Sequence, residues 1–486
     1  MSLLMYLTML AMYIVVGTLI AVVSRRLGIR TVQDYYVAGY RLSGFLASMT
    51  YAATTYSAFM MIGLVGLSYA TGVGALGFEL AYFVATLTFL ALFSKKVWSM
   101  ARKRKWVSPA EMLSDLYGSK ILGIIVSLIY LVALVPYISA QLIGIGRLLE
   151  GIGGYEYYVY GVLLGSIIIF AWTFIAGIWS VATTDTYQGL WMIIASLAYI
   201  AWLYLIMYPN ANVNLAEVFR ELGSKKLLGL SDFWALHVFL AFTIPWVFFA
   251  VTNPQVVQRL YMPRDEKALF KMISLFALFG FSYTIIVTLV GLGARGLTEA
   301  GILDYIEVRD LVTPILLGKM HSALAAFIFT SIVAAAVSTA DSIILTVAST
   351  MSKDLYMKLS RRPSERKALT IGYLTIASLV IITVCIALTK PGFIVEMSVL
   401  SSVILLPLAP VTIAAWITSE VRNKEMKLTA ITSLALGTIV SLYVAIIYGP
   451  KKAFIMTWYG LPISFWTLIV TTVLILIGYL VVKMKT

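Results

Sequence analysis

Cysteine and histidine are nearly absent from this chain of 486 residues. The only cysteine is Cys385, which lies in an apolar run, so the sequence excludes a disulfide framework and a multi-cysteine metal site. The two histidines, His237 and His321, do not form a metal-ligand pair by spacing, and we expect both at the ends of membrane spans.

Charge is also scarce, because only 12% of the residues are charged while 61% are hydrophobic. The mean hydropathy is +0.95. No aqueous fold of this length could hide so much apolar side chain. The composition therefore predicts an all-α polytopic membrane protein whose main solvent is the lipid bilayer.

The N-terminal region lacks the features of a cleaved signal peptide. Residues 3–23 form an apolar run longer than a signal core, and no basic residue precedes it. Arg25 and Arg26 follow the run instead. This order predicts a first span whose N-terminus lies outside the cell.

A spanning helix needs about 20 largely apolar residues, and about thirteen segments satisfy this length. They are 4–24, 43–70, 74–94, 120–149, 157–176, 180–208, 233–257, 268–294, 321–352, 368–389, 393–418, 428–448 and 460–483. An odd number of spans places the C-terminus on the cytoplasmic side, and we expect a multi-pass protein of the plasma membrane.

The distribution of basic residues supports this topology. The densest clusters are Lys95-Lys96, Arg102–Lys105 and Arg361-Arg362, and all fall in segments expected to be cytosolic. A bias of Lys and Arg towards the inside is the usual topology signal. It accounts for the net charge of +14, and because these residues are scattered over short loops we expect no nucleic-acid partner.

The spans divide into two blocks of five, residues 43–208 and 233–418, joined by an extracellular loop at 209–232. Five is odd, so the blocks would have opposite orientations in the membrane, as inverted repeats do. An extra helix and the first cytosolic loop (1–42) precede the blocks, and two helices (419–486) follow them. No loop is long enough to hold a separate soluble core, and we expect the chain to function as a monomer.

The first span of each block is irregular. Residues 48–57 carry a dense group of Ser, Thr and Tyr, and the second block opens with Pro245 and Pro254 nine residues apart. One interpretation is local hydroxyl-to-carbonyl bonding, close helix contacts and a simple proline kink. The other is a pair of broken helices whose freed carbonyls face a binding site.

Hydroxyl side chains share one face of the ninth span. Ala335, Ser338, Thr339, Ser342 and Thr346 recur at spacings of three and four. Asp341 lies in the same turn, and Asp185 lies near the start of the sixth span. Carboxylates at membrane depth are costly and indicate function, and hydroxyl and carboxylate oxygens suit a hard cation. Asp185 could also be a simple helix-entry carboxylate.

Two further carboxylates lie towards the outer ends of their spans. Glu79 is interpreted either as facing a vestibule or solute, or as an outer interfacial residue. Glu396 is expected to be interfacial. No Lys or Arg is predicted at mid-membrane, so no fixed cation is expected beside a solute carboxylate.

Four stretches resemble the sodium:solute symporter family. Residues 57–66 look like its first core helix, Thr184-Asp185 with Gln188 like its Thr-Asp-x-x-Gln motif, and Gln258-Arg259 like the Gln-Arg motif after its sixth core helix. The stretch Ser338–Ser342, followed by Asp354-Leu-Tyr356, resembles its sodium-site helix. The resemblance covers about residues 30–440, and the four motifs occur in the family's order.

The resemblance implies a five-plus-five inverted repeat of the LeuT type, alternating access and a sodium ion between the first and eighth core helices. Its implied ligands are the carbonyls of Ala53, Tyr56 and Ala335 and the hydroxyls of Ser338 and Thr339. Members with a second sodium imply a further set, Asp185, Ser338, Asp341 and Ser342. Asp341 stands where those members have a hydroxyl, so the number of sodium ions stays open.

The fourth span contains Pro136-Tyr137 and Gln141. This motif resembles a pattern of monocarboxylate and amino-acid carriers, but it also suits a kinked packing helix.

We predict a small polar solute between the two irregular spans, and favour an amino acid or a small organic acid over a sugar. The predicted solute contacts are Thr55, Ser57, Glu79, Tyr137, Gln141 and Trp246. The function predicted is sodium-coupled import rather than enzymatic catalysis.

Other functions compete with this interpretation. A proton-coupled carrier of the same fold would use Asp341 or Asp185 as its titrating group. Related helical modules occur fused to kinase domains as solute sensors; because this sequence shows no such domain, we expect a sensor less than a carrier. A channel would show a repeated pore-lining motif, and none occurs.

Overall fold

The computed structural model describes residues 3–28, 36–175 and 178–485 of the chain. Eleven of its helices are long and apolar enough to cross a membrane, and two bent helix pairs raise the number to thirteen. The predicted all-α polytopic architecture and the number of spans are confirmed. Long apolar runs form helices in lipid because only helices and closed barrels satisfy every backbone polar group there.

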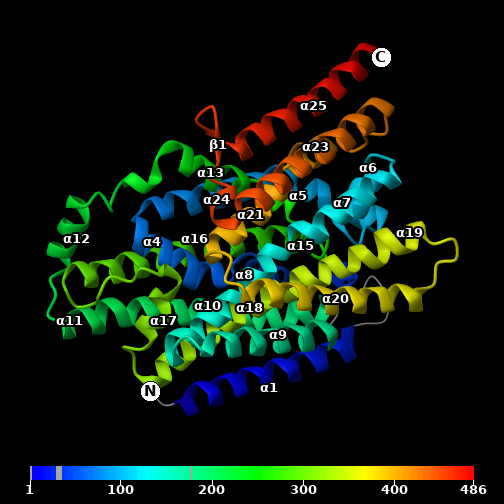
Figure 1. The fold of residues 1–486 in the computed structure, drawn as a ribbon. Coiled ribbons are helices and arrows are strands. Elements are labelled where there is room, and N and C mark those ends of the chain that lie inside the picture. Colours follow the sequence, from blue (N-terminus) through cyan, green and yellow to red (C-terminus); the bar gives the residue numbers. More distant parts are fainter. Residues whose placement is uncertain (1–2, 29–35, 176–177, 486) are drawn as a thin grey trace.

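The spans run roughly parallel through one bundle (Figure 1). In chain order they are α1 (Leu3–Gly28); α3 (Gly44–Thr55) with η2 (Phe59–Leu64) and α4 (Val65–Thr71); α5 (Gly74–Arg104); α7 (Lys120–Ala133) with α8 (Val135–Gly153); α9 (Tyr157–Ile175); α10 (Ile178–Trp202) with η3 (Leu203–Met207); α13 (Leu236–Val247) with α14 (Phe249–Thr252) and α15 (Pro254–Arg259); α16 (Glu266–Glu299); α18 (Ser322–Thr350) with η6 (Met351–Tyr356) and α19 (Met357–Leu359); α20 (Glu365–Leu388); α21 (Ile394–Leu405) with α22 (Leu408–Thr418); α23 (Lys424–Tyr448); and α25 (Ile463–Lys485).

Short elements connect the spans. They are η1 (Ala38–Tyr40), α6 (Pro109–Leu116), α11 (Tyr208–Asn210), α12 (Leu215–Ser224), η4 (Asp232–Trp234), η5 (Arg309–Leu311), α17 (Val312–Leu317), α24 (Pro450–Ala453) and a hairpin of β1 (Thr457–Trp458) and β2 (Leu461–Pro462). Helix α6 begins at Pro109, and its N-cap is Ser108, whose side chain accepts from the backbone N–H of Glu111.

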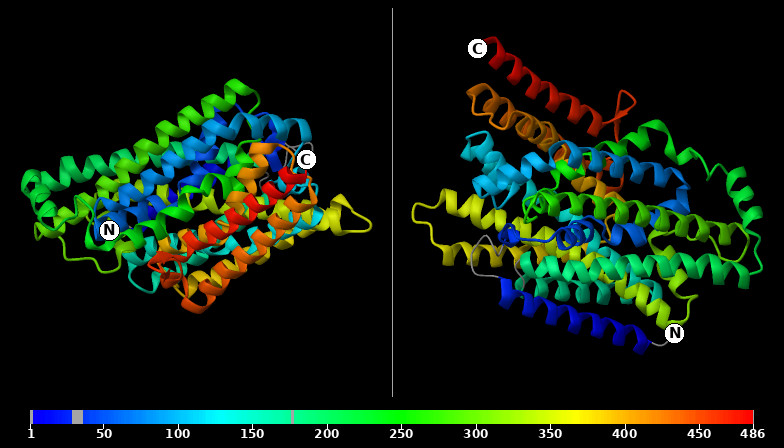
Figure 2. Two further views of the ribbon diagram at one scale, coloured as in Figure 1. Left: turned by 90° about the horizontal axis from the view of Figure 1, so that it is seen from above. Right: turned by 180° about the vertical axis from the view of Figure 1, so that it is seen from behind.

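The centre of the bundle is formed by α3, α10, α16 and α18, in which α3 and α10 each pack against the other three. Almost every residue of α18 from Ala325 to Thr350 is buried, so this helix lies in the interior of the bundle. Helix α1 packs on α9, α10 and α18, while α25 packs mainly on α23. These peripheral helices lie on opposite flanks of the bundle (Figures 1 and 2).

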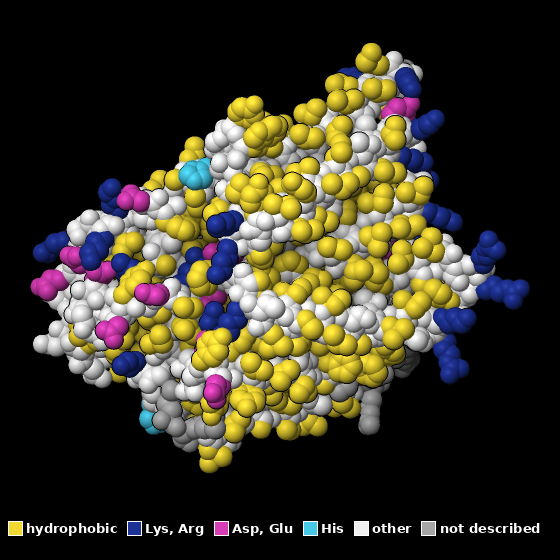
Figure 3. Space-filling view, viewed as in Figure 1, with side chains coloured by type: hydrophobic (Ala, Val, Ile, Leu, Met, Phe, Trp, Pro, Cys, Tyr) yellow, Lys and Arg dark blue, Asp and Glu magenta, His cyan; other side chains and the backbone are white. Residues whose placement is uncertain are grey.

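Charge is sorted along the axis of the bundle. Hydrophobic side chains cover its middle, while Lys and Arg gather at the end that carries α19 and the C-terminus (Figure 3). The opposite end carries charges of both signs around α11, α12 and α17. The two termini of the chain lie at opposite ends of the bundle (Figure 1), which agrees with an odd number of spans.

Two further spans, the fourth and the eleventh, are also interrupted. The eleventh span is bent by 55° between α21 and α22, where Pro407 follows α21. The fourth span is interrupted at Leu134, just before Pro136 in α8. Proline lacks an N–H and clashes with the carbonyl one turn earlier, which accounts for both interruptions.

Candidate functional site

The second span is broken, as the sharper interpretation of its polar residues predicts. Helix α3 ends at Thr55, Tyr56 is extended (φ −95°, ψ 108°), and the chain turns by 50° before continuing as η2 and α4. The hydroxyl of Ser57 accepts from the N–H of Phe59 at 3.1 Å. The side chain of Gln141 in α8 accepts from the N–H of Ala58 at 3.2 Å. These two side chains satisfy backbone groups that lipid could not.

The seventh span is also broken, at Phe248 and again at Asn253. Pro245 lies inside α13, and Pro254 starts α15. Both breaks lie deep in the protein, where every described residue from 249 to 262 is buried. The second and seventh spans therefore share an interruption in corresponding positions of the two five-span blocks.

The hydroxyl face of α18 meets the end of α3. Ser338 donates to the carbonyl of Ala53 at 2.9 Å and to that of Ala335 at 3.0 Å. Thr339 donates to the same Ala53 carbonyl at 3.1 Å. Four of the five residues of the first predicted sodium set thus lie in one cluster, and the fifth, Tyr56, is the residue at the break itself. Hydroxyl and carbonyl oxygens are the ligands that a hard cation prefers.

The second predicted set surrounds an arginine that sequence reasoning did not place there. Arg259 is fully buried; it donates to the hydroxyl of Ser342 at 2.6 Å and lies 3.9 Å from the carboxylate of Asp185. Thr50 donates to the same Asp185 oxygen at 2.6 Å, and Thr54 lies 2.9 Å from Ser342. Sequence reasoning expected no fixed cation beside a carboxylate within the spans, but the structure buries the Arg259 guanidinium next to Asp185.

The break of the seventh span explains the position of Arg259. In an unbroken helix, Arg259 would follow the apolar segment at the cytosolic surface. The interruption at Asn253 instead directs α15 against α3, α6 and α18. Gln258 secures this docking, because it accepts from Thr346 at 2.8 Å and donates to the carbonyls of Tyr36 and Val107. The Gln-Arg motif was visible in the sequence, but its depth in the membrane was not.

Asp341 has a different partner from Asp185. Its carboxylate accepts from Thr173 of α9 at 2.7 Å, and it is 4% exposed. Sequence reasoning missed Thr173, and a lone threonine in an apolar span gives no signal that could have identified it. The second predicted set is therefore divided: Asp185 and Ser342 contact Arg259, Asp341 accepts from Thr173, and Ser338 donates to the carbonyl of Ala53.

The extra N-terminal helix reaches this region through Tyr13. With the Gln188 amide oriented so that its oxygen accepts from the Tyr13 hydroxyl at 2.7 Å, its nitrogen donates to Asp185 at 3.2 Å. Asp185 is thus held by Thr50, Gln188 and Arg259 from three different spans. A simple helix-entry carboxylate would not need such partners, so the alternative interpretation of Asp185 is disfavoured.

The predicted solute contacts are mostly close together. Glu79 of α5 accepts from the indole N–H of Trp246 at 3.1 Å, and the ring of Tyr137 lies 6.4 Å from that of Trp246. Gln141 donates to the carbonyl of Tyr137 at 3.1 Å and, with Ser57, holds the break of the second span. The hydroxyl of Thr55 is buried without a hydrogen bond.

A separate cluster lies at the end of the bundle that carries α17. Arg309 of η5 forms a buried ion pair with Glu396 of α21, and its guanidinium lies 4.5 Å from the ring of Phe393. The neighbouring Asp310 accepts from the N–H of Ile394 at 3.0 Å. Glu396 is therefore buried in an ion pair, a partner that the sequence did not indicate.

The histidines lie at the ends of spans. The side chain of His321 caps α18 by accepting from the N–H of Ala323, and His237 is exposed at the start of α13. Among the described residues, no three His, Cys, Asp or Glu side chains form a metal-binding group. A cation in this part of the chain would rely on hydroxyls, carbonyls and single carboxylates.

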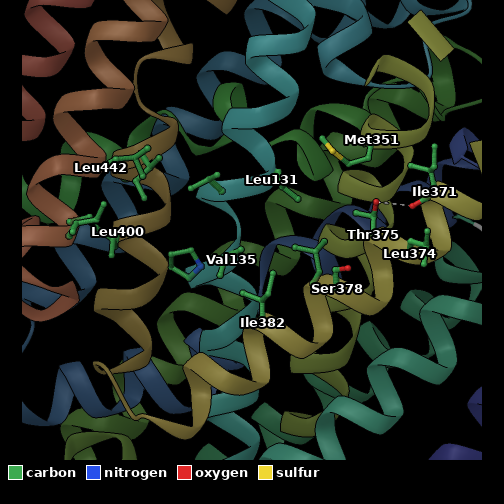
Figure 4. Close-up of a pocket in the computed structure, with 16 residues that line it drawn as sticks. Leu131, Val135, Met351, Ile371, Leu374, Thr375, Ser378, Ile382, Leu400 and Leu442 are labelled. Atoms are coloured by element: carbon green, nitrogen blue, oxygen red, sulfur yellow. Dashed lines mark hydrogen bonds between the residues drawn. The ribbon is translucent and has the colours of Figure 1, made fainter. Parts of the chain in front are cut away.

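A groove of about 630 Å³ lies apart from these polar clusters. It is lined almost entirely by apolar side chains of α7, α8, α20, α21 and α23, including Leu131, Ile382 and Leu442 (Figure 4). Its two hydroxyl side chains are those of Ser378 and of Thr375, which donates to the carbonyl of Ile371 in its own helix. Such a surface fits lipid chains and offers few polar groups to orient a polar solute.

A bundle of thirteen spans, broken at matching positions around buried oxygens, defines a polytopic α-helical transporter of the secondary type. The chain belongs to the sodium:solute symporter family, whose model matches residues 35–417. It is therefore a sodium-coupled symporter of a small-molecule solute and not an enzyme, and sodium is its coupling ion. The family prediction made from the four motifs is confirmed.

Curated relatives and solved structures agree with this assignment. The chain is 28% identical over 371 residues to a sodium/pantothenate symporter of Haemophilus influenzae, covering 74% of each chain. It is 25% identical over 407 residues to a sodium/proline symporter of Staphylococcus aureus, covering 78% of this chain and 74% of the relative.

Two solved structures share the fold. A sodium-coupled sialic acid symporter in a substrate-bound outward-open state has a TM-score of 0.77 at 18% identity, covering 98% of this chain and 96% of its own. A nucleobase-cation-symport-1 family transporter in a closed conformation has a TM-score of 0.58 at 13% identity, covering 94% and 96%.

Proposed function

We propose that one sodium ion binds where the break of the second span meets α18. Its ligands are the carbonyls of Ala53, Tyr56 and Ala335 and the hydroxyls of Ser338 and Thr339. The observation that carries this proposal is that two hydroxyls of α18 converge on one carbonyl of α3, that of Ala53. Both hydroxyls donate to that carbonyl, and a sodium ion would be bound by lone pairs of the same oxygens.

Sodium at this junction would hold the two helices together and favour one access state of the carrier. The solute would bind between the breaks of the second and seventh spans and favour the same state. Each ligand then increases the affinity for the other, which is the basis of coupled import by alternating access. Residues 43–208 and 233–418 act as inverted repeats in this proposal.

A second cation site would involve Asp185, Ser338, Asp341 and Ser342. The guanidinium of Arg259 already balances the charge of Asp185 and bonds to Ser342. A second sodium ion would have to displace the guanidinium of Arg259 or bind nearer to Asp341 and Thr173. We therefore propose one sodium ion per cycle while Arg259 holds this position.

The solute is a small polar molecule, and an amino acid or small organic acid fits the site best. Of the two relatives, one carries proline and the other pantothenate. The proposed contacts are Thr55, Ser57, Glu79, Tyr137, Gln141 and Trp246. All proposed ligands come from a single chain, so a monomer suffices. We place it in the plasma membrane, with the N-terminus outside and the C-terminus in the cytoplasm.

The test is sodium binding in the absence of solute. The double variant Ser338→Ala/Thr339→Ala should lose the rise in Tm that sodium, but not potassium, gives the purified full chain. Thr330→Ala is the matched control, because Thr330 is a buried threonine of the same helix that bonds only to the carbonyl of Ala326. Unchanged sodium stabilisation in the double variant would move the site elsewhere.

A further inference from the structure

Glu79 is a buried carboxylate without a balancing charge. Its side chain is 1% exposed, and among the described residues its only hydrogen-bond donor is the indole of Trp246. No Lys, Arg or His of the described chain forms an ion pair with it, in contrast to Asp185, Glu396 and Asp354. An ionised carboxylate in such surroundings needs a cationic partner.

Aromatic rings surround the indole that holds Glu79. The ring of Trp246 packs against five others, with centroid distances between 5.0 and 6.4 Å: Phe59, Phe249, Tyr82, Phe78 and Tyr137. The faces of such rings carry negative potential and attract cations, most strongly where water is excluded. A carboxylate and several ring faces together form the chemical environment that selects a positively charged nitrogen.

This aromatic group lies where three spans are irregular. Phe59 follows the break of the second span, Trp246 follows Pro245 of the seventh, and Tyr137 follows Pro136 of the fourth. Broken helices of this kind place binding groups near the middle of a transporter. The group is therefore part of the solute site proposed above and is separate from the sodium ligands on α18.

We infer that the solute carries a positively charged nitrogen, an ammonium or quaternary ammonium group, which binds to the Glu79 carboxylate among the rings around Trp246. This inference rests on the proposed solute site and makes its chemistry more specific. An amino acid or a betaine satisfies it. A simple monocarboxylate is disfavoured, because a second anion beside Glu79 would be repelled, and a neutral sugar would leave the carboxylate uncompensated.

The experiment compares probes of the same shape that differ in charge. The purified full chain in saturating sodium is heated with glycine betaine or 3,3-dimethylbutyrate, choline or 3,3-dimethylbutanol, and L-proline or cyclopentanecarboxylate. We expect at least one cationic probe to raise the Tm while its isostere without nitrogen does not. An isostere that stabilises equally well, or a panel without any stabilising cationic probe, overturns the inference.

Variants then assign the effect to Glu79. Glu79→Gln should weaken the stabilising probe by about ten- to a hundredfold, the usual loss when a hydrogen bond to a charged group is removed. Glu79→Asp keeps the negative charge and should retain part of the affinity for the stabilising probe. It serves as the test if Glu79→Gln does not fold. Trp246→Phe keeps a ring but removes the N–H donor. Unchanged probe affinity in both Glu79 variants overturns the assignment.

Sodium alone separates this inference from the proposed function. If sodium without solute does not stabilise the wild-type chain, the sodium site fails. If sodium stabilises wild type and Glu79→Gln equally but the probes show no preference for the cation, only the present inference fails. If Glu79→Gln loses the sodium response itself, then sodium is the partner of Glu79 and the ammonium assignment is overturned.

Discussion

The guanidinium of Arg259 donates a 2.6 Å hydrogen bond to Ser342 and lies 3.9 Å from the carboxylate of Asp185. Both ionic side chains are buried, at 0% and 1% exposure. This pair joins the short helix after the second break of the seventh span to α10 and α18. It places a fixed positive charge where the sequence resemblance implies a second sodium ion.

The first prediction concerns the stability of this pair. Arg259→Gln should destabilise the protein by about 3 to 5 kcal/mol, because it leaves Asp185 buried and unpaired. The double variant Asp185→Asn/Arg259→Gln should lower the free energy of unfolding less than Arg259→Gln alone, because it leaves no buried charge without a partner. Thermal unfolding of the purified variants measures this; purely additive effects would contradict a direct interaction.

The second prediction concerns the number of sodium ions. With Arg259 in place, the sodium dependence of stabilisation or uptake should have a Hill coefficient near one. Removing the guanidinium in Arg259→Gln opens the second oxygen set, so the coefficient should rise towards two. A wild-type coefficient near two that falls to one in Asp185→Asn would instead place a sodium ion beside Asp185 in the native cycle.

The third prediction concerns Gln141, which holds the break of the second span. Gln141→Met is similar in shape but cannot accept from the N–H of Ala58, so it should lower the free energy of unfolding by about 1 to 3 kcal/mol. Ser139→Ala is the control, because that hydroxyl makes only a 3.4 Å bond to the carbonyl of Thr383. Equal Tm shifts in the two variants would argue against a role of Gln141 at the break.

The fourth prediction is a pH dependence of stability that originates in Asp310. Burial, with a smaller contribution from Glu396, raises the pKa of Asp310 to about 6, although Arg309, the N–H of Ile394 and Arg147 act in the opposite direction. The folded protein therefore binds this proton more tightly than the unfolded chain, whose pKa is near 3.8. The stability that Asp310 contributes by binding this proton is complete below pH 4 and is lost as the pH rises through 6.

This difference between the folded and unfolded pKa of Asp310 corresponds to roughly 3 kcal/mol in the free energy of unfolding. Asp310→Asn should remove this component, because asparagine can still accept from the N–H of Ile394 but does not titrate. Unfolding curves at pH 4 to 7 should therefore show a steeper fall of Tm with rising pH for wild type than for the variant. Parallel curves would show that Asp310 does not titrate in this range.

The fifth prediction concerns topology. On a Cys385→Ser background, Asp304→Cys should react with a membrane-impermeant maleimide added to intact cells, whereas Lys103→Cys should react only after permeabilisation. Both native residues are exposed in loops or at the ends of helices, so access to reagent is not limiting. The opposite labelling pattern would invert the proposed orientation.

The sequence by itself determined the class, the spans and most of their bounds. Apolar runs of about 20 residues can only be membrane helices, because lipid offers no partner for backbone N–H and C=O groups. The same constraint made the break at Tyr56 predictable, since hydroxyls and prolines gathered there in two corresponding spans. Spacings of three and four placed Ser338 and Thr339 on one face of α18 before their shared contact with Ala53 was known.

Only the tertiary structure decided what each buried charge faces. Arg259 looks like a surface residue in the sequence, and it reaches the centre because the interruption at Asn253 redirects α15 into the bundle. Thr173 and Glu396 likewise acquire partners from helices far apart in the chain. Local periodicity fixes which side of a helix a residue occupies, but the partner depends on how separate helices pack, and that information is not local.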